Sequence, residues 1–222
     1  MGLMLCADIS FCDVADRLLF LDLKADRYFC LGPRAEAGFR AAISGAQPAG
    51  EWEAALRPLI QCGILVPTTD DCRPSACSGS ASPVKSFLDC GYAEVPIRLR
   101  MAALKDLAVA QLALKFRSLS AVLGALRLQK SRAAYHSDAM SASAQDVAAA
   151  FEWSSRIVRT HDRCLPRSIA VAQRLASLNI AAELVIGVSL YPFAAHSWVQ
   201  CGTALVNDRP DGVRHFTPIL TI

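Results

Sequence analysis

Apolar and polar positions alternate along residues 17–31 in the manner of two β-strands. Leu19, Leu21 and Leu23 fall on one face of the first strand, and the apolar pattern resumes at residues 28–31 after a polar turn. Because the polar turn between the two runs is short, we expect them to pair as a β-hairpin.

Two short helices are predicted after this hairpin. Pro33 suits the first turn of a helix, which then runs over residues 34–43 to a Ser-Gly stop. A second helix covers residues 51–60 and is followed by the apolar run 64–66. Residues 1–66 therefore read as a small winged-helix-like unit, with strands first and helices after.

Residues 67–83 are rich in Thr, Asp, Ser, Gly and Pro, and the part at 75–82 reads SACSGSAS. Such a composition lacks the apolar side chains needed to build a core and is typical of a flexible connector. We therefore expect three parts: a unit at 1–66, a linker at 67–83 and a larger domain at 84–222.

The larger domain is predicted to begin with helices and end with strands. Helical periodicity covers residues 98–127 and 145–159, with a polar break at 131–144 between them. A third helix spans residues 164–178, with an apolar stripe and Asn179 placed to cap its end. Strand patterns then appear in three places, at residues 182–190, 196–200 and 203–206. The chain as a whole is thus expected to be α+β, with the 164–178 helix packed on an antiparallel sheet.

Composition narrows the function classes. The chain has 53% apolar and 19% charged residues and a formal charge of +3. A core can be buried, whereas the clustered cations of a nucleic-acid-binding protein are lacking. We also find no signal peptide and no apolar run of the roughly 20 residues that a membrane span needs. A cytoplasmic location without membrane attachment is therefore expected.

Nine cysteines are irregularly spaced and form no CxxC pair. In a cytoplasmic protein most such cysteines act as small buried apolar residues, and a disulfide framework is not expected. A metal site built from Cys62, Cys72, Cys77 and Cys90 is the alternative, but their spacing does not favour it. We predict neither a metal nor a cofactor.

Cys164 is the candidate nucleophile. Pro166 is tolerated only in the first turn of a helix, and Asp162 is a candidate cap, so Cys164 lies at a helix start. Unpaired backbone N–H groups and the helix dipole stabilise a thiolate at such a position. The Cys164 backbone N–H is also placed to stabilise an oxyanion.

His196 and Asp208 are the candidate base and orienting carboxylate. His196 lies on a predicted strand, and Asp208 follows the next short strand, so a hairpin between them brings the carboxylate to the imidazole. Each residue also has an ordinary structural interpretation as a packing cysteine, a semi-buried histidine or a turn aspartate. His161 is a rival base, three residues before the cysteine, with a less suitable approach.

Four sequence segments resemble the lasso-peptide maturation B proteins. They are residues 164–168 (CLPRS), 184–188 (LVIGV), 192–199 (PFAAHSWV) and 206–208 (VND). This resemblance implies a papain/transglutaminase-like cysteine peptidase with Cys164, His196 and Asp208 as its catalytic residues. It also implies cleavage of the leader–core amide bond of a lasso-peptide precursor, in antimicrobial-peptide biosynthesis. An asparagine-synthetase-like partner would then close the macrolactam with ATP. Arg167 and Ser168 match the pattern but receive no catalytic role.

Residues 1–66 resemble the leader-recognition element related to the small carrier protein of pyrroloquinoline quinone biosynthesis. The resemblance implies that the leader is held as an added strand at a sheet edge, with a helix beside it. In this chain it points to Tyr28, Phe29, Cys30 and Leu31, with the 51–60 helix as the second wall. An ordinary core hairpin is the alternative interpretation.

Two other functions fit the same residues. A Cys-His-Asp order also serves acyl transfer to amines, as in transglutaminases and arylamine acetyltransferases. The chain can also be interpreted as a non-catalytic scaffold that binds a precursor and delivers it to a cyclase. His215 lies outside the matching segments and is expected to be exposed.

Overall fold

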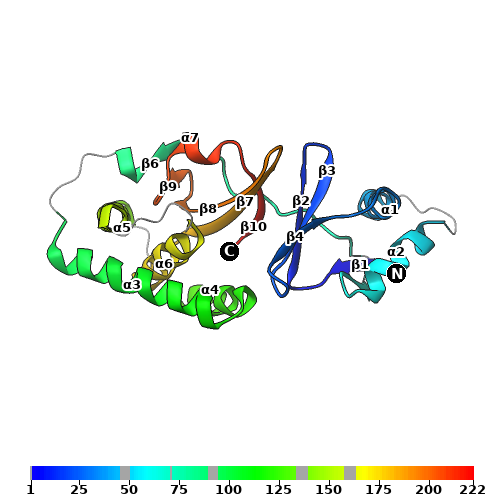
Figure 1. The fold of residues 1–222 in the computed structure, drawn as a ribbon, viewed down its shortest axis with the longest axis horizontal. Helices are drawn as coiled ribbons and strands as arrows, with labels where there is room; N and C mark the ends of the chain where they lie inside the picture. The colour runs from blue at the N-terminus through cyan, green and yellow to red at the C-terminus, as the bar shows by residue number, and fades with distance from the viewer. Residues whose placement is uncertain (1, 46–50, 71, 90–94, 134–139, 158–163) are drawn as a thin grey trace. The chain divides into compact units, whose positions relative to one another are not determined.

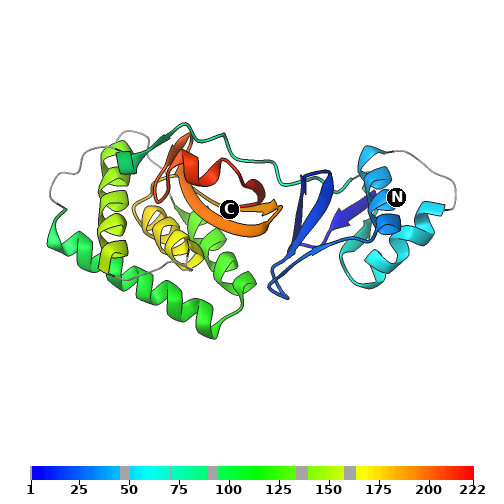
Figure 2. The ribbon, with the colours of Figure 1, turned by 45° about the horizontal axis from the view of Figure 1, so that its top comes forward.

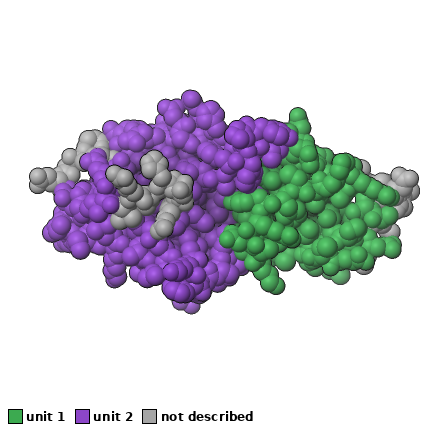
Figure 3. All heavy atoms as spheres, in the orientation of Figure 1, with its two compact units in different colours: residues 1–78 green, residues 79–222 purple. Residues whose placement is uncertain are grey.

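The computed structural model describes residues 2–45, 51–70, 72–89, 95–133, 140–157 and 164–222. The chain divides into two compact units, Met1–Ser78 and Gly79–Ile222, which are coloured separately in Figure 3. Each unit has its own secondary structure, and each is described here by itself.

Unit 1 contains two small antiparallel sheets and two helices (Figure 1). Its elements are β1 (Gly2–Leu5), β2 (Ile9–Val14), β3 (Arg17–Asp22), β4 (Arg27–Cys30), α1 (Pro33–Ser44), α2 (Glu51–Gln61) and β5 (Leu65–Thr68). The predicted hairpin is confirmed, because β3 and β4 pair antiparallel with Phe20 opposite Phe29. Strands β1 and β2 were not predicted; β2 pairs with β3 and β1 pairs with β5.

Aromatic rings form the core of unit 1. The Phe11 and Phe20 rings stack at 5.4 Å, and the Phe39 ring meets each of them edge-on at 5.1 Å. Leu56 of α2 and Leu65 of β5 are buried in the same cluster. The sheet and both helices therefore close around a single apolar centre.

The boundary between the units falls inside the segment predicted as a linker. On one side of the boundary, Leu3 N–H donates to Cys72 O and Cys77 N–H donates to Phe11 O, both at 2.9 Å. On the other side, the Gln200 amide donates to Ala81 O at 2.8 Å. The described parts of the segment are thus hydrogen-bonded to the unit to which they belong, while its flexibility stays a prediction.

Unit 2 contains a five-stranded sheet with helices (Figures 1 and 2). Its elements are β6 (Lys85–Ser86), η1 (Phe87–Asp89), α3 (Ile97–Phe116), α4 (Leu119–Arg132), α5 (Met140–Ile157), α6 (Cys164–Ser177), β7 (Glu183–Leu190), β8 (Phe193–Cys201), β9 (Ala204–Leu205), α7 (Pro210–Val213) and β10 (Thr217–Thr221). The strand order is β10-β7-β8-β9-β6. The chain is therefore α+β, as expected.

The helices predicted around residues 98–127 are α3 and α4, which are separate because the Ser118 hydroxyl accepts from Ala121 N–H and caps a new start. Two predictions about unit 2 need correction. The sheet is antiparallel except at its edge, where β6 pairs parallel with β9. Helix α5 begins at Met140, inside the predicted polar break, since Ala144 and Ala148 are small helix formers that are fully buried.

Helix α6 lies at the centre of unit 2, between the sheet and the other long helices (Figure 2). Its C-terminus is a Schellman motif: Asn179 has φ 56°, its N–H donates to Ala176 O, and Ile180 N–H donates to Leu175 O. Leu175 is fully buried. The predicted cap is confirmed, and it fixes where α6 ends and β7 can start.

Leu175→Ala should lower the free energy of unfolding by about 2–5 kcal/mol, because it opens a cavity beneath the central helix. Leu178→Ala is the matched control: it removes the same atoms three residues later, where the side chain is 47% exposed. Denaturant unfolding followed by circular dichroism measures both. Equal effects at the two positions would contradict the central packing of α6.

Candidate active site

Cys164 is the first residue of α6, as predicted, and its side chain is half-buried. Pro166 lies in the first turn, where its missing N–H has no helical partner to lose. Asp162, the candidate cap, and His161, the rival base, lie outside the described residues. The thiol therefore sits at the positive end of a 14-residue helix.

The structure brings His196 and Asp208 together with Cys164. His196 Nε2 lies 2.5 Å from Asp208 Oδ2. His196 also lies close enough to the Cys164 thiol to lower the pKa of that thiol. Because Asp208 occupies Nε2, Nδ1 is the ring nitrogen left to face the sulfur. The imidazole thus interacts with both the thiol and the carboxylate.

Strand pairing explains how these distant residues meet. His196 lies on β8 opposite Gly187 of β7. After β8 the chain turns at Gly202, with φ 58°, and Val206 N–H donates to Val199 O at 2.8 Å. This short return, predicted from the sequence as a hairpin, carries the chain back to Asp208.

The charges of the site are coupled. Burial alone raises the pKa of Cys164, but hydrogen bonds with His196 and Ser197 and the charge of His196 outweigh it, so that the pKa lies below its ordinary value of 9.0. The hydrogen bond to Asp208, with a further one to Cys164, raises the pKa of His196 to about 9. Both shifts favour a thiolate–imidazolium pair near neutral pH.

Asp208 is held by its own surroundings. Its Oδ1 accepts from Arg209 N–H at 2.7 Å, which leaves Oδ2 to His196. Its backbone oxygen accepts from the Ser86 hydroxyl of β6 at 2.6 Å. Gly212 of α7 passes so close that a Cβ there would lie 2.5 Å from Asp208 Oδ1. The carboxylate therefore has little room to turn away from the imidazole.

A buried polar network joins α6 to β8 next to the candidate triad. The Ser168 hydroxyl donates to Ser197 O and accepts from the Asn207 amide, each at 2.9 Å. Asn207 Oδ1 in turn accepts from Val199 N–H at 2.7 Å. Sequence reasoning gave Ser168 no catalytic role and missed the parts of Ser197 and Asn207. The sequence signal that could have found them is their position. Ser197 and Asn207 are next to His196 and Asp208, and Ser168 lies one helical turn after Cys164.

Two aromatic side chains flank the imidazole. The Trp198 and Phe216 ring centroids lie 6.3 and 5.2 Å from that of His196. Gly187 allows this packing, because a Cβ there would lie 2.7 Å from the Trp198 ring and 2.9 Å from Phe216 Cβ. These rings exclude water from one side of the histidine and limit its rotation.

Arg167 is engaged elsewhere, and His215 is exposed as predicted. The Arg167 guanidinium forms a 3.0 Å ion pair with Glu152 of α5. It therefore ties the start of α6 to a neighbouring helix. No group of three or more His, Cys, Asp or Glu within the described ranges is placed to hold a metal, and Cys90 of the alternative metal set lies outside them.

The residues predicted to contact a leader lie on or just after β4, the terminal strand of its sheet. Phe29 stacks on Phe20 at 5.3 Å, and Leu31 is 6% exposed, so both side chains belong to the unit 1 core. Tyr28 and Cys30 alternate with Phe29 and project to the other face. Helix α2, the predicted second wall, packs against α1 and β5.

The sequence of unit 2 matches a known class of protein. The family model of the transglutaminase-like superfamily matches residues 106–221, just over half of the chain, so the chain belongs to that superfamily.

A more specific similarity is to the microcin J25-processing protein McjB of Escherichia coli, which is 50% identical over 48 residues. That match spans 22% of this chain and 23% of the relative's length. No solved structure matches the chain significantly. Among the helices of the described residues, none is long and apolar enough to cross a membrane.

We predict that Cys164 is alkylated by iodoacetamide at neutral pH faster than the other cysteines, because its pKa is lowered. His196→Ala should slow alkylation at pH 7 by about tenfold or more, since the contributions of His196 are lost and only the Ser197 hydrogen bonds then oppose the effect of burial on the thiol pKa. In the wild type, as the pH rises through about 9, His196 loses its proton and the ion pair is lost while the thiolate remains. Peptide mapping by mass spectrometry across pH measures each site. Identical pH profiles for Cys164 in the two proteins would contradict the coupling.

Gly212→Ala should displace the Asp208 carboxylate, because the added methyl group has no space beside Oδ1. The pKa of His196 should then fall from about 9 toward its ordinary value of 6.5. NMR titration of the imidazole measures the shift. Gly124→Ala, at an exposed helix position with nothing within 4 Å, is the control. An unchanged His196 titration in Gly212→Ala would refute the role of this close approach.

Proposed function

We propose that this chain is a cysteine peptidase that removes the leader from a lasso-peptide precursor. The observation that carries the proposal is the His196 imidazole, which contacts the Asp208 carboxylate and lowers the pKa of the Cys164 thiol. Membership of the transglutaminase-like superfamily and the similarity to a microcin-processing protein support it. The name of that relative, a microcin J25-processing protein, is the basis for choosing a peptide precursor as the substrate.

The chemistry follows from the protonation states. The Cys164 thiolate attacks the carbonyl carbon of the leader–core bond, and the backbone N–H groups at the start of α6 stabilise the oxyanion. The His196 imidazolium gives its proton to the departing core amine, which leaves the leader bound as a thioester. Neutral His196 then takes a proton from the water that attacks the thioester, the leader leaves with a free carboxylate, and the thiolate–imidazolium pair is restored. Asp208 keeps the ring oriented throughout.

Unit 1 would supply leader binding in this scheme. Strand β4 is terminal in the three-stranded sheet of unit 1, and such an edge offers main-chain groups to an added peptide strand. The main chain at Tyr28, Phe29, Cys30 and Leu31 would give affinity, and the side chains of Tyr28 and Cys30 would help to set the register. Binding through the leader raises the effective concentration of the scissile bond at Cys164.

The product defines the partner. Hydrolysis releases a core peptide with a free amino group, which an asparagine-synthetase-like cyclase would join to a side-chain carboxyl using ATP. The reaction proposed for this chain needs no metal or cofactor of its own, and we place it in the cytoplasm with the partner. Nucleic acid and membrane have no part in it.

Cys164→Ala should abolish leader release while leaving precursor binding within about twofold, because unit 1 is untouched. A lasso-peptide precursor serves as substrate, with mass spectrometry for cleavage and fluorescence anisotropy for binding. Cys201→Ala, another partly buried cysteine of unit 2, is the matched control and should retain cleavage. Leader release by Cys164→Ala would overturn the assignment of the nucleophile.

Acyl transfer to an amine is the main rival, because the superfamily includes that chemistry. Incubating the wild type with precursor and a primary amine distinguishes the two. A peptidase yields leader with a free carboxylate, whereas a transferase yields the leader amide. Failure to give either product, with Cys164 unreactive toward iodoacetamide, would favour a non-catalytic scaffold.

A further inference from the structure

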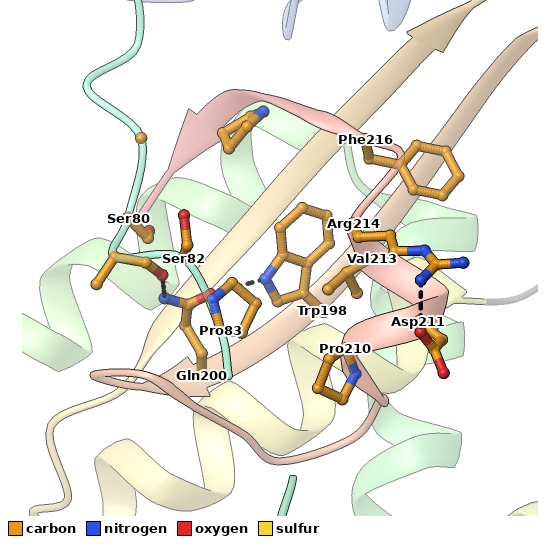
Figure 4. Close-up of a pocket in the computed structure, with 13 residues that line it drawn as sticks. Ser80, Ser82, Pro83, Trp198, Gln200, Pro210, Asp211, Val213, Arg214 and Phe216 are labelled. Carbon is orange, nitrogen blue, oxygen red and sulfur yellow. Dashed lines mark hydrogen bonds and ion pairs between the residues drawn. The ribbon is translucent and has the colours of Figure 1, made fainter. Parts of the chain in front are cut away.

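A pocket of about 570 Å³ lies within unit 2 (Figure 4). Trp198 and Phe216 form one wall, residues 79–83 form another, and α7 and Arg214 complete it. The volume falls in the range of roughly 300–1,000 Å³ that is usual for ligand sites. It is therefore large enough to hold part of a peptide.

The pocket shares two of its lining residues with the surroundings of the candidate triad. Its Trp198 and Phe216 walls are the rings that flank His196, with Phe216 centred 5.2 Å from the imidazole. Asp211 and Val213 line it, and Gly212 between them approaches Asp208. The pocket therefore lies on the histidine and aspartate side of the triad.

That position decides which part of a substrate would occupy it. In cysteine hydrolysis the histidine protonates the departing amine, so the departing segment must lie on the imidazole side of the sulfur. The acyl part stays attached to the cysteine. For a precursor cut after its leader, the departing segment is the start of the core peptide.

We infer that this pocket binds the core residues directly after the scissile bond and selects them by side-chain type. The inference rests on the proposed peptidase function. It makes the pocket a specificity site separate from the leader-binding edge of unit 1.

The lining indicates the chemistry of the residues it accepts. Trp198 donates to Gln200 Oε1 at 2.9 Å, and the Gln200 amide donates to Ala81 O and Gly202 O, so these polar groups are already satisfied. Rings and proline side chains make up much of the rest of the lining, namely Phe216, Pro83, Pro210 and Pro218. The Arg214 and Asp211 side chains are 64% and 87% exposed, and they form an ion pair in which their opposite charges cancel. An uncharged, apolar segment therefore fits best, because a charge placed among the rings loses its hydration.

Gly79→Phe tests the pocket without altering the triad or the two rings. A Cβ at Gly79 would contact Pro218, another lining residue, at 3.6 Å, which is ordinary packing, so a larger side chain is tolerated at this point of the lining and is intended to narrow the pocket. Gly124→Phe on α4, with open space around it, is the matched control. The substrates are precursors with Leu or Asp as the second residue after the scissile bond, and precursors with the same exchange two residues before it.

Wild type and Gly124→Phe should cleave the Leu precursor about tenfold or more better than the Asp precursor by kcat/KM. Gly79→Phe should lose most of this preference through slower cleavage of the Leu precursor. Its discrimination on the leader side should match that of the control. A change confined to the leader side, or identical behaviour of the two variants, overturns the inference.

A binding measurement separates the pocket from the peptidase function. Calorimetry with a free hexapeptide carrying Leu at its second position should show binding to wild type and Gly124→Phe. Binding to Gly79→Phe, or binding of the Asp hexapeptide, should be at least about tenfold weaker. This pattern without any leader release would overturn the proposed function and leave the pocket assignment standing. Equal binding to both variants, or no measurable binding to any of them, overturns the pocket assignment.

Discussion

The packing of α6 against β8 is the interaction on which the rest of unit 2 depends. Cys164 is useful only if its helix begins beside the strand that carries His196. The Ser168 hydroxyl fixes that relation, because it binds the Ser197 main chain and the Asn207 amide at once. All three network residues are buried, so the loss of one would leave polar groups without partners. Because each hydrogen bond has one partner at one distance, the network specifies the position of α6 along β8 more closely than non-directional apolar contacts would.

The electrostatics of the site follow from this geometry. A thiolate in a partly buried position is unfavourable unless a positive charge is held next to it. The carboxylate of Asp208 supports that charge on His196, and the close approach of Gly212 in α7 keeps the carboxylate in place. Trp198 and Phe216 complete the enclosure from the side. The carboxylate thus supports the imidazolium, and the imidazolium supports the thiolate. Trp198 and Phe216 also line the pocket assigned to the core peptide.

Much of the local structure could be predicted because it depends on short-range pattern. The hairpin at β3 and β4, the start of α6 at Cys164 and its cap at Asn179 all follow from residues close in sequence. Two of the strands that were not predicted have a different cause. Strand β6 has two residues and pairs with β9 more than a hundred positions later, and β1 pairs with β5 across the whole of unit 1. Such strands carry too few residues for a periodic signal, so only long-range pairing defines them.

The sequence by itself determined which residues were eligible for chemistry: a cysteine at a helix start, a histidine on a strand and an aspartate after a tight return. Those properties are local, because helix starts, strand alternation and turns depend on neighbouring residues. Tertiary structure alone decided that one imidazole reaches both partners, that Ser168 and Asn207 clamp α6 to β8, and that a pocket adjoins the histidine. Distances between helices and strands depend on how side chains from separate segments pack against one another, and a local sequence pattern does not determine that packing.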